Sequence, residues 1–460
     1  MSYDLIVIGG GPGGYVAAIR AAQLGAKVAL VEKDSVGGTC LNRGCIPTKA
    51  LIASASVLEN IKNAANFGLQ VENYKIDFGQ IMARKDAVVK HMLTGVNYLI
   101  KKNKIDLISG TAKVLSNSMV EVQKQDGSVE KIEGKNIILA TGSEPALIAS
   151  LGYNGKTVIT SNEILNIESI PESLLIIGGG VIGCEFATIF AALGSKITIV
   201  EAMPSILPMV DSELTKRFAL LLKKRGITVK TKAMITAVKE TENGVSAELE
   251  SGEVLTAEKV LISIGRTFNT KGLGLEEVGV ELGPKGEILV NDYMETNVPG
   301  IYAIGDVTNK IQLAHVASAQ GILLVENLFG GKREKMKYNA VPSCIFTAPE
   351  IASVGISEDQ AKQQGMAINV GKFPFTACGK AVCLGETDGM VKFIADKETD
   401  KVLGVHIMGP HATDLIAEAT LAVNMGLTSE QLAKTIHAHP TLAETLMEAA
   451  EGVHGKSIHI

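Results

Sequence analysis

The sequence predicts an α/β fold with two Rossmann-like dinucleotide-binding domains followed by a C-terminal α+β domain. Three observations support this prediction: a duplicated unit of strand, glycine turn, helix and strand, apolar runs that do not alternate with polar residues, and an antiparallel strand pattern beyond about residue 340. A crossover helix returns the chain to the end of the sheet where the first strand began, so strands joined in this way run parallel. The 460 residues are enough for roughly three domains of about 150 residues each.

The duplicated unit occupies residues 4–33 and again residues 174–202. Each copy opens with a continuous apolar run, Leu5–Ile8 or Leu174–Ile177, which is typical of a strand covered on both faces. Small and apolar residues at helical spacing follow, and each such segment ends at a glycine, which favours a helix C-terminus. The glycines expected to end the two helices are Gly25 and Gly194.

The glycine turns of both copies predict dinucleotide binding. Glycines let the backbone approach a pyrophosphate, the following helix N-terminus offers N–H donors, and an acid about 20 residues later accepts hydrogen bonds from a ribose. Each match stands between a strand and a helix, which makes the pair stronger evidence than a single glycine motif. The residues predicted to bind the two dinucleotides are Gly9, Gly11, Pro12, Gly14, Glu32 and Lys33 in the first copy and Gly178, Gly180, Val181, Ile182, Gly183 and Glu201 in the second.

The acid of the second copy indicates which nicotinamide dinucleotide binds there. Glu201 would repel a 2′-phosphate, and residues 202–210 contain no arginine that could bind one. NAD is therefore favoured over NADP.

Charge and composition exclude several classes of protein. The chain has 44 Lys+Arg against 49 Asp+Glu, a net charge of −5, so it lacks the basic surface that nucleic acid or an anionic membrane would require. The uncharged stretch Leu5–Ile19 is too short to span a bilayer, and Asp4 is atypical of a signal peptide. We predict a cytoplasmic protein with no nucleic acid or membrane partner and no metal site.

Strand patterns follow each copy of the duplicated unit. Lys113–Val122 and Val129–Ile138 flank an Asp-Gly turn, and Thr228–Glu240 and Gly244–Leu249 form a similar pair. Beyond about residue 338, short strands and helices predict a separate α+β domain with an antiparallel sheet. The strands expected there are 354–355, 367–373, 390–395 and 402–408, and the helices are 357–365, 411–425 and 429–436.

Cys40 and Cys45 are the strongest candidates for redox chemistry. They stand five residues apart in the segment CLNRGCIPTK, within ten residues of the first duplicated unit. Two thiols at this spacing can close a small disulfide ring at the start of a helix, where the pKa of a thiol is lowered. Lys49 would lie one helical turn after Cys45.

The other cysteines lack this context. Six cysteines in 460 residues are too few for a secreted disulfide scaffold. Cys378 and Cys383 repeat the five-residue spacing without a glycine turn, so we expect no second redox pair. Cys184 and Cys344 are expected to be packed side chains.

Several motifs together resemble the flavoprotein disulfide reductases, the class I pyridine nucleotide-disulfide oxidoreductases, over nearly the whole chain. They are the two glycine turns, CLNRGCIPTK, and residues 140–143, 304–307 and 437–444. The similarity is closest to the dihydrolipoamide-oxidising members. It implies a homodimer that uses FAD and NAD. The regions it implies are an FAD-binding domain (1–145), an NAD-binding domain (146–270), a central segment that completes the FAD site (271–337) and an interface domain for dimerisation (338–460).

The resemblance assigns roles to four residues around the flavin. Cys40 corresponds to the interchange thiol that meets the substrate, and Cys45 to the thiol packed on the flavin. Lys49 corresponds to the lysine beside the reactive ring nitrogen, and Glu185 to its ion-pair partner near the nicotinamide. Cofactor contacts are further implied for Gly38, Thr39, Lys49, Ala112, Thr141, Gly142, Ser143, Glu185, Gly265, Gly305, Asp306, Leu313, Ala314 and His315.

His439 and Glu444 correspond to a base and its orienting acid, which the other subunit donates. Imidazole titrates near neutral pH, so His439 could accept a thiol proton, and Glu444 could fix its tautomer. The resemblance also suggests a cis bond between His439 and Pro440.

The function implied is oxidation of protein-bound dihydrolipoyl groups through a Cys40–Cys45 disulfide and FAD, with reduction of NAD. The implied partners are lipoyl domains of a 2-oxo acid dehydrogenase, acetoin dehydrogenase or glycine cleavage complex. Another disulfide reductase of the same family and a redox-inert docking subunit are the alternatives. Glu201 argues against a glutathione-type reductase, and an NADH oxidase would not need both cysteines. The docking subunit is disfavoured because all five residues of the expected redox site are present: Cys40, Cys45, Lys49, His439 and Glu444.

Overall fold

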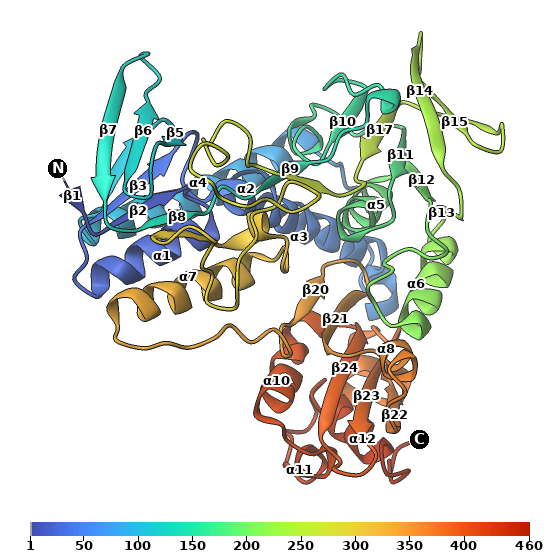
Figure 1. Cartoon of the computed structure of the whole chain (residues 1–460). Helices are drawn as coiled ribbons and strands as arrows, with labels where there is room; N and C mark the ends of the chain where they lie inside the picture. Colours follow the sequence, from blue (N-terminus) through green and yellow to red (C-terminus); the bar gives the residue numbers. More distant parts are fainter. Residues whose placement is uncertain (1) are drawn as a thin grey trace.

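Two parallel five-stranded sheets carry the two glycine turns in the computed structural model, which describes residues 2–460 (Figure 1). The first sheet has the strand order β19-β8-β2-β3-β4, and the second has the order β10-β17-β11-β12-β13. The strands of the first are β2 (Leu5–Ile8), β3 (Val28–Glu32), β4 (Asp106–Ser109), β8 (Ile137–Leu139) and β19 (Ile301–Ala303). Those of the second are β10 (Val158–Thr160), β11 (Ser173–Ile177), β12 (Lys196–Glu201), β13 (Thr228–Thr231) and β17 (Lys259–Ile262).

The duplicated units occupy equivalent places in the two sheets. In each unit the first strand, β2 or β11, pairs in parallel with the second, β3 or β12. Every residue of β2 is buried, as expected for an apolar strand covered on both faces. The connecting helices are α1 (Pro12–Gln23) and α5 (Val181–Leu193), and they end beside Gly25 and Gly194, both with positive φ. The predicted fold class is confirmed.

The remaining helices of the two units connect strands or cover the sheets. They are α2 (Gly38–Arg43), α3 (Cys45–Lys62), α4 (Phe78–Lys102), α6 (Ser212–Lys224) and α7 (Ala314–Phe329), with short 3-10 turns at 64–67, 149–151, 164–166 and 305–308. Helices α1 and α7 lie side by side beneath the first sheet (Figure 1). The segment from 301 to 329 thus returns to the first unit, about 300 residues after that unit begins in the numbering.

Two small sheets differ from the strand boundaries expected from the sequence. The first contains β1 (Ser2–Tyr3), β5 (Thr111–Val114), β6 (Met119–Gln123) and β7 (Val129–Gly134), and the second contains β14 (Ile235–Thr241), β15 (Gly244–Leu249) and β16 (Val254–Ala257). Their strands pair antiparallel, except that β1 runs parallel to β7. The single strand predicted over 113–122 is wrong, because the chain reverses at Ser116–Ser118 and forms two strands. The single strands predicted over 129–138 and 228–240 are also wrong, since each divides between two sheets.

The C-terminal domain contains the predicted antiparallel sheet, in the order β20-β21-β24-β23-β22. Its strands are β20 (Ser343–Ile345), β21 (Glu350–Gly355), β22 (Ile368–Pro374), β23 (Met390–Asp396) and β24 (Val402–Gly409). Its helices are α8 (Glu358–Gln363), α9 (Gly379–Leu384), α10 (Ala412–Met425), α11 (Ser429–Ala433) and α12 (Glu444–Gly452), with a 3-10 turn at 375–377. The helix predicted over 429–436 is shorter, and α9 and α12 were not predicted.

One apolar core joins the second sheet to the C-terminal domain. Phe190 of α5 and Phe218 of α6 belong to the same buried cluster as Ile351 and Met408 of the antiparallel sheet. Figure 1 shows α6 against the C-terminal domain. Within residues 2–460, no helix combines the length and apolar character that a membrane crossing requires. The cytoplasmic location stays a prediction.

Strands β9 (Ser143–Pro145) and β18 (Arg266–Phe268) connect the two units directly. They pair antiparallel, with Ser143 opposite Phe268 and Pro145 opposite Arg266. Strand β9 follows β8 of the first parallel sheet in the chain, and β18 follows β17 of the second. The pairing therefore brings the carboxyl ends of the two parallel sheets to a common region, where ligands bind in folds of this class.

Candidate active site

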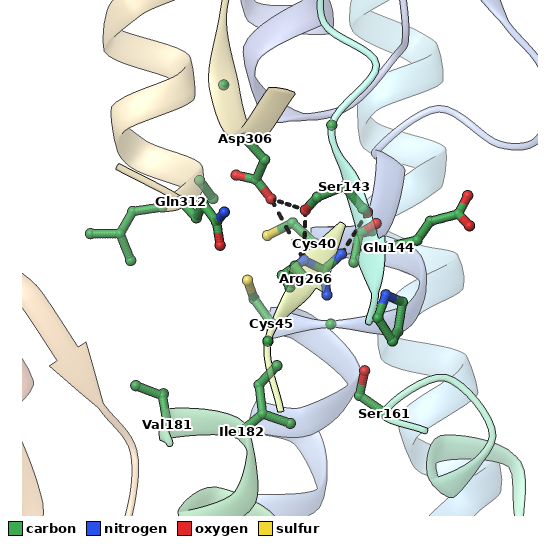
Figure 2. A pocket seen from close by; sticks show the side chains of 18 of the residues that line it. Cys40, Cys45, Ser143, Glu144, Ser161, Val181, Ile182, Arg266, Asp306 and Gln312 are labelled. Atoms are coloured by element: carbon green, nitrogen blue, oxygen red, sulfur yellow. Dashed lines mark hydrogen bonds and ion pairs between the residues drawn. The ribbon is translucent and has the colours of Figure 1, made fainter. Parts of the chain in front are cut away.

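A continuous cavity of about 2100 Å³ extends from the first glycine turn to the second. Ligand pockets usually have volumes of about 300–1,000 Å³, so this one has room for two large ligands. Its wall includes both glycine turns, the paired strands β9 and β18, the start of α7, and residues of the C-terminal domain. Figure 2 shows Cys40 and Cys45 in this wall, between Asp306 on one side and Ile182 on the other.

The first glycine of each turn passes close to a neighbouring strand. Gly9 has φ +104°, and a Cβ there would lie 2.4 Å from the carbonyl oxygen of Ala140. Gly178 has φ +105°, and its Cβ would lie 2.4 Å from the carbonyl oxygen of Ser263. Both positions therefore require glycine, for the same reason in both copies.

The third glycine of each turn has a packing role. A Cβ on Gly14 would lie 1.8 Å from the carbonyl oxygen of Gly9, and one on Gly183 would lie 2.1 Å from that of Gly178. Neither Gly14 nor Gly183 lines the cavity. Gly14 and Gly183 allow each helix to pack closely against its own turn. Contact with a cofactor had been predicted for both from the sequence.

The middle glycine of each turn leaves a helix N-terminus open to the cavity. Gly11 and Gly180 are the N-caps of α1 and α5, and neither helix has a side-chain cap or an acidic residue in its first turn. No atom lies within 4 Å of a Cβ built on Gly180. The first N–H groups of both helices are thus available to an anion such as a pyrophosphate.

The acid at the end of the first unit is fixed by backbone donors. The N–H of Gly10 donates to Glu32 Oε2 at 2.6 Å, and the N–H of Asp34 donates to Oε1 at 2.8 Å. Burial raises the pKa of Glu32, against the effect of the hydrogen bond from Gly10. A carboxylate has about four acceptor positions, so Glu32 keeps capacity for ribose hydroxyls.

Glu201 has the same arrangement in the second unit. The N–H groups of Gly179 and Met203 donate to its two oxygens at 2.7 and 2.6 Å. The cavity wall beside Glu201 contains Met203, Met209 and Met234. An acid with apolar neighbours suits a ribose with a free 2′-hydroxyl and disfavours a 2′-phosphate.

The thiols of Cys40 and Cys45 influence each other's ionisation. Cys40 lies in α2, and Cys45 is the first residue of α3, after the N-cap Gly44. The neighbouring Cys40 thiol and the charge of Lys49 lower the pKa of Cys45 to about 7, although burial opposes them. The neighbouring Cys45, together with burial, raises the pKa of Cys40. In the reduced pair the negative charge therefore resides on Cys45.

Lys49 and Glu185 form an ion pair between the two units. Lys49 Nζ lies 2.9 Å from both carboxylate oxygens of Glu185, which extends from α5. The N–H of Phe346 also donates to Glu185 at 3.0 Å, and the Phe346 ring lies 4.4 Å from Lys49 Nζ. A cation from the first unit, an anion from the second and a residue of the C-terminal domain thus meet one helical turn from Cys45.

A second polar network faces the cysteines from the other side (Figure 2). The hydroxyl of Ser143 donates to Asp306 Oδ2 at 2.5 Å, and Arg266 Nε donates to that hydroxyl at 2.6 Å. Arg266 also donates to the carbonyl oxygen of Ser143 at 2.6 Å and lies 3.8 Å from Asp306. Site roles were predicted from the sequence for Ser143, Asp306 and Gly265 but not for Arg266.

His439 and Glu444 lie outside the cavity of their own chain. His439 Nδ1 and Glu444 Oε1 are 2.8 Å apart, and the N–H of Thr441 donates to the other carboxylate oxygen at 2.8 Å. Burial would raise the pKa of Glu444, but these hydrogen bonds hold it below its usual value. The side chain of His439 is 77% exposed, and the bond to Pro440 is cis, as the resemblance suggested.

Comparison with known proteins identifies the family to which this chain belongs. A family model described as pyridine nucleotide-disulphide oxidoreductase matches residues 3–321, and the model of its dimerisation domain matches residues 341–450. The chain belongs to the pyridine nucleotide-disulphide oxidoreductase family. Membership confirms the predicted oxidoreductase class and the predicted cofactors FAD and NAD, and the dimerisation domain supports the predicted homodimer.

Relatives within this family extend over the whole chain. The sequence is 46% identical over 470 residues to dihydrolipoyl dehydrogenase from Bacillus subtilis (strain 168), with 99% of both chains covered. It is 44% identical to the mitochondrial dihydrolipoyl dehydrogenase 1 of Arabidopsis thaliana, with 99% of this chain and 91% of the relative covered. Among solved structures, LpdA from Mycobacterium tuberculosis has a TM-score of 0.92 at 28% identity, with 97% of this chain and 99% of that chain covered.

The cavity fits the two cofactors of the family. Its volume suits two dinucleotides, and each end has one uncapped helix N-terminus and one carboxylate with free acceptor positions. Near the cysteines, Gly142 and Gly265 have no atom within 4 Å of a Cβ position, so their backbone is open to a ligand. The first unit and Asp306 would hold FAD, and the second unit would hold NAD.

The structure brings together nearly all of the predicted site residues. Every predicted cofactor-binding residue except Gly14 and Gly183 lines the cavity, as do Cys40, Cys45, Lys49 and Glu185. Sequence reasoning missed Arg266 and Phe346. Arg266 could have been identified, since it directly follows the predicted Gly265. Nothing in the sequence indicated Phe346, because it contacts Glu185 from the C-terminal domain.

The contacts of Cys45 predict how the reduced pair ionises. We expect the first thiol proton to be lost near pH 7, because the pKa of Cys45 is lowered to about 7. Lys49→Met should shift this ionisation to higher pH by removing a nearby cation. Glu185→Gln should shift it to lower pH, since the charge of Glu185 raises the pKa of Cys45. Ultraviolet thiolate absorbance measured against pH, with Cys45→Ser as the baseline, checks both directions. Shifts of the same sign in Lys49→Met and Glu185→Gln would contradict the electrostatic explanation.

Proposed function

We propose that this protein is a dihydrolipoyl dehydrogenase. It oxidises the dithiol of a dihydrolipoyl group through a Cys40–Cys45 disulfide and reduces NAD. The observation that carries the proposal is the placement of Cys40 and Cys45 in the wall of one cavity between two dinucleotide turns, next to the Lys49–Glu185 pair. The relatives named dihydrolipoyl dehydrogenase support the choice of substrate.

Exchange of sulfur–sulfur bonds follows from the two cysteines. One substrate thiolate attacks Cys40 Sγ, the Cys40–Cys45 bond breaks, and Cys45 leaves as a thiolate. The second substrate thiol then loses its proton and attacks the substrate sulfur bound to Cys40. This closes the lipoyl disulfide and releases Cys40 as a thiolate, which becomes a thiol by taking up one proton. The lowered pKa of Cys45 makes it the better leaving group, which favours attack on Cys40.

His439 of the second subunit would accept the substrate proton. Its Nδ1 is held by Glu444, which leaves Nε2 to face the substrate and stabilises the imidazolium once it forms. Within its own chain His439 is exposed and outside the cavity, so a dimer must bring it to Cys40. When bound, FAD accepts the electron pair of the dithiol and supplies a hydride to NAD.

The partners follow from the substrate. We propose that lipoyl domains of a 2-oxo acid dehydrogenase, acetoin dehydrogenase or glycine cleavage complex deliver the dithiol. A glutathione-type, NADPH-linked reductase is the second candidate. The site around Glu201 counts against this candidate, because the carboxylate would repel the 2′-phosphate of NADPH and the apolar neighbours offer no cation to bind it.

Direct assay of the holoenzyme tests the function. We expect dihydrolipoamide to reduce NAD at least about tenfold faster than it reduces NADP. A tenfold difference in rate corresponds to about 1.4 kcal/mol of activation free energy. Lipoylated domains of the three kinds of complex, offered in parallel, identify the partner. Reduction of glutathione disulfide by NADPH without reaction of dihydrolipoamide would overturn the proposal.

A further inference from the structure

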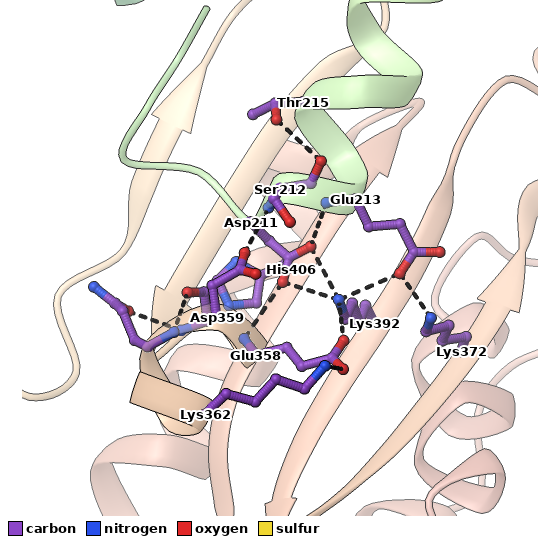
Figure 3. Close-up of polar contacts among 12 residues, drawn as sticks. Asp211, Ser212, Glu213, Thr215, Glu358, Asp359, Lys362, Lys372, Lys392 and His406 are labelled. Carbon is purple, nitrogen blue, oxygen red and sulfur yellow. Dashed lines mark hydrogen bonds and ion pairs between the residues drawn. The ribbon is translucent and has the colours of Figure 1, made fainter. Parts of the chain in front are cut away.

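A buried ion-pair cluster connects the C-terminal domain to the second unit (Figure 3). Lys392, on β23, has 1% of its surface exposed, and Asp211, just before α6, has none exposed. Lys392 Nζ lies 3.0 and 2.9 Å from the two oxygens of Asp211, 2.6 Å from Glu358 and 3.3 Å from Glu213. These distances make Lys392 the centre of the cluster.

The outer carboxylates of this cluster have cations of their own. Lys372 lies 2.7 Å from Glu213, and Lys362 lies 2.6 Å from Glu358. Asp211 has no such second lysine among its contacts within residues 2–460, so its compensation comes from Lys392 and from backbone donors. Removing one partner of a buried pair leaves the other charge uncompensated, which is costly. Asp211 is therefore held in one place by Lys392.

Asp211 ends the segment 202–210, which lies along the second glycine turn. The N–H of Leu207 donates to the carbonyl oxygen of Gly179 in that turn at 2.9 Å. Leu207 is fully buried and has φ +48°, a conformation rarely adopted outside glycine. On the cavity side, Met203 and Met209 of the same segment line the wall. The segment thus has one face on the glycine turn and one face toward the ligand.

Both ends of this segment are fixed by carboxylates. At its start, the N–H of Met203 donates to Glu201, and at its end Asp211 caps α6 by accepting from the N–H of Glu213 at 3.0 Å. Glu201 belongs to the second unit itself. Asp211, in contrast, is bound by a lysine of the C-terminal domain. A continuous set of contacts therefore runs from Lys392 through Asp211 and the segment to the wall of the second nucleotide site.

We propose that Lys392 is a positioning residue for the nucleotide of the second unit: through Asp211, the C-terminal domain sets the place of segment 202–210 and so the affinity for NAD. The inference rests on the proposed function, in which this unit binds NAD. It differs from a purely stabilising role, because a stabilising pair would change the unfolding temperature without changing NAD affinity.

Binding to the FAD-loaded dimer tests the inference. Lys392→Met and Asp211→Asn should each weaken NAD binding, measured by calorimetry, by about tenfold, within the range seen for couplings through packed networks. The double variant should lose little more than either single variant, since both remove one interaction. The KM for NAD should rise in the same proportion while the KM for dihydrolipoamide stays unchanged. Asp211→Asn keeps the helix cap, so it carries the test if Lys392→Met does not fold.

A matched control uses an exposed ion pair of the same domain. Lys434 lies 2.6 Å from Glu430 on the surface, away from the cavity, and Lys434→Met should leave NAD affinity unchanged. If the wild type binds NAD and both cluster variants bind it equally tightly, with only a lower unfolding temperature, the inference is overturned and the proposed function stands. A wild type that binds no NAD overturns both.

Discussion

Cys45→Ser is expected to abolish oxidation of dihydrolipoamide, with a loss on the order of 10⁴-fold or more, the scale seen when a covalent catalytic residue is removed. Serine cannot form a sulfur–sulfur bond, so neither the disulfide nor its leaving group exists in the variant. The flavin should remain bound, because the first glycine turn and Asp306 are unaffected. Measuring NAD reduction and the ratio of FAD to protein checks both halves of this expectation.

Cys383→Ser is the matched control for this variant. Cys383 is an exposed cysteine on α9 that lies outside the cavity, and we expect its replacement to leave activity unchanged. Cys378, five residues earlier, is buried and donates to the carbonyl oxygen of Thr441 at 3.6 Å. Substantial activity in Cys45→Ser, or its loss in Cys383→Ser, would move the redox chemistry away from the pair in the cavity wall.

His439→Gln is expected to slow dihydrolipoamide oxidation by about 10²- to 10⁴-fold, the usual contribution of a general base. Glutamine can still donate to Glu444 but cannot accept a proton at neutral pH. The stronger test mixes two inactive parents, Cys45→Ser and His439→Gln, after reversible dissociation. If sites form between subunits, random pairing restores about one quarter of the wild-type sites, as the statistics of a twofold-symmetric dimer require.

The reason for this recovery is geometric. In a mixed dimer, the intact His439 of one subunit meets the intact cysteine pair of the other, while the second site has neither. His439 is exposed, its partner Glu444 is half-buried, and both lie outside the cavity of their own chain, so we expect them to act at the site of the other subunit. An inactive mixture that contains proven mixed dimers would show that each site is complete within one chain.

Local patterns made much of the site predictable. The glycine turns could be identified because their requirements are local: Gly9 and Gly178 need positive φ and have a carbonyl oxygen against them. The cysteine pair could be identified because five residues separate Cys40 from Cys45 in a segment next to the first turn. In each case the chemistry depends on residues close together in the chain.

Long-range contacts were harder to predict. Phe346 contacts Glu185 across 161 residues, and Lys392 contacts Asp211 across 181 residues. No pattern in the sequence predicts either contact. The resemblance named Asp306 and Ser143 separately, and only the fold shows that Arg266 joins them. The strand errors have a local cause, since the polar turn at Ser116–Ser118 is too short to interrupt an otherwise strand-like stretch.

Peptide mapping by mass spectrometry tests most directly whether Cys40 and Cys45 are the redox pair. The FAD-loaded protein is quenched with an alkylating reagent in three states: as purified in air, after dihydrolipoamide, and after dihydrolipoamide followed by NAD. We predict a Cys40–Cys45 disulfide in the first state, two alkylated thiols in the second, and the disulfide again in the third. Alkylated Cys40 and Cys45 in all three states would contradict a reversible bond between them.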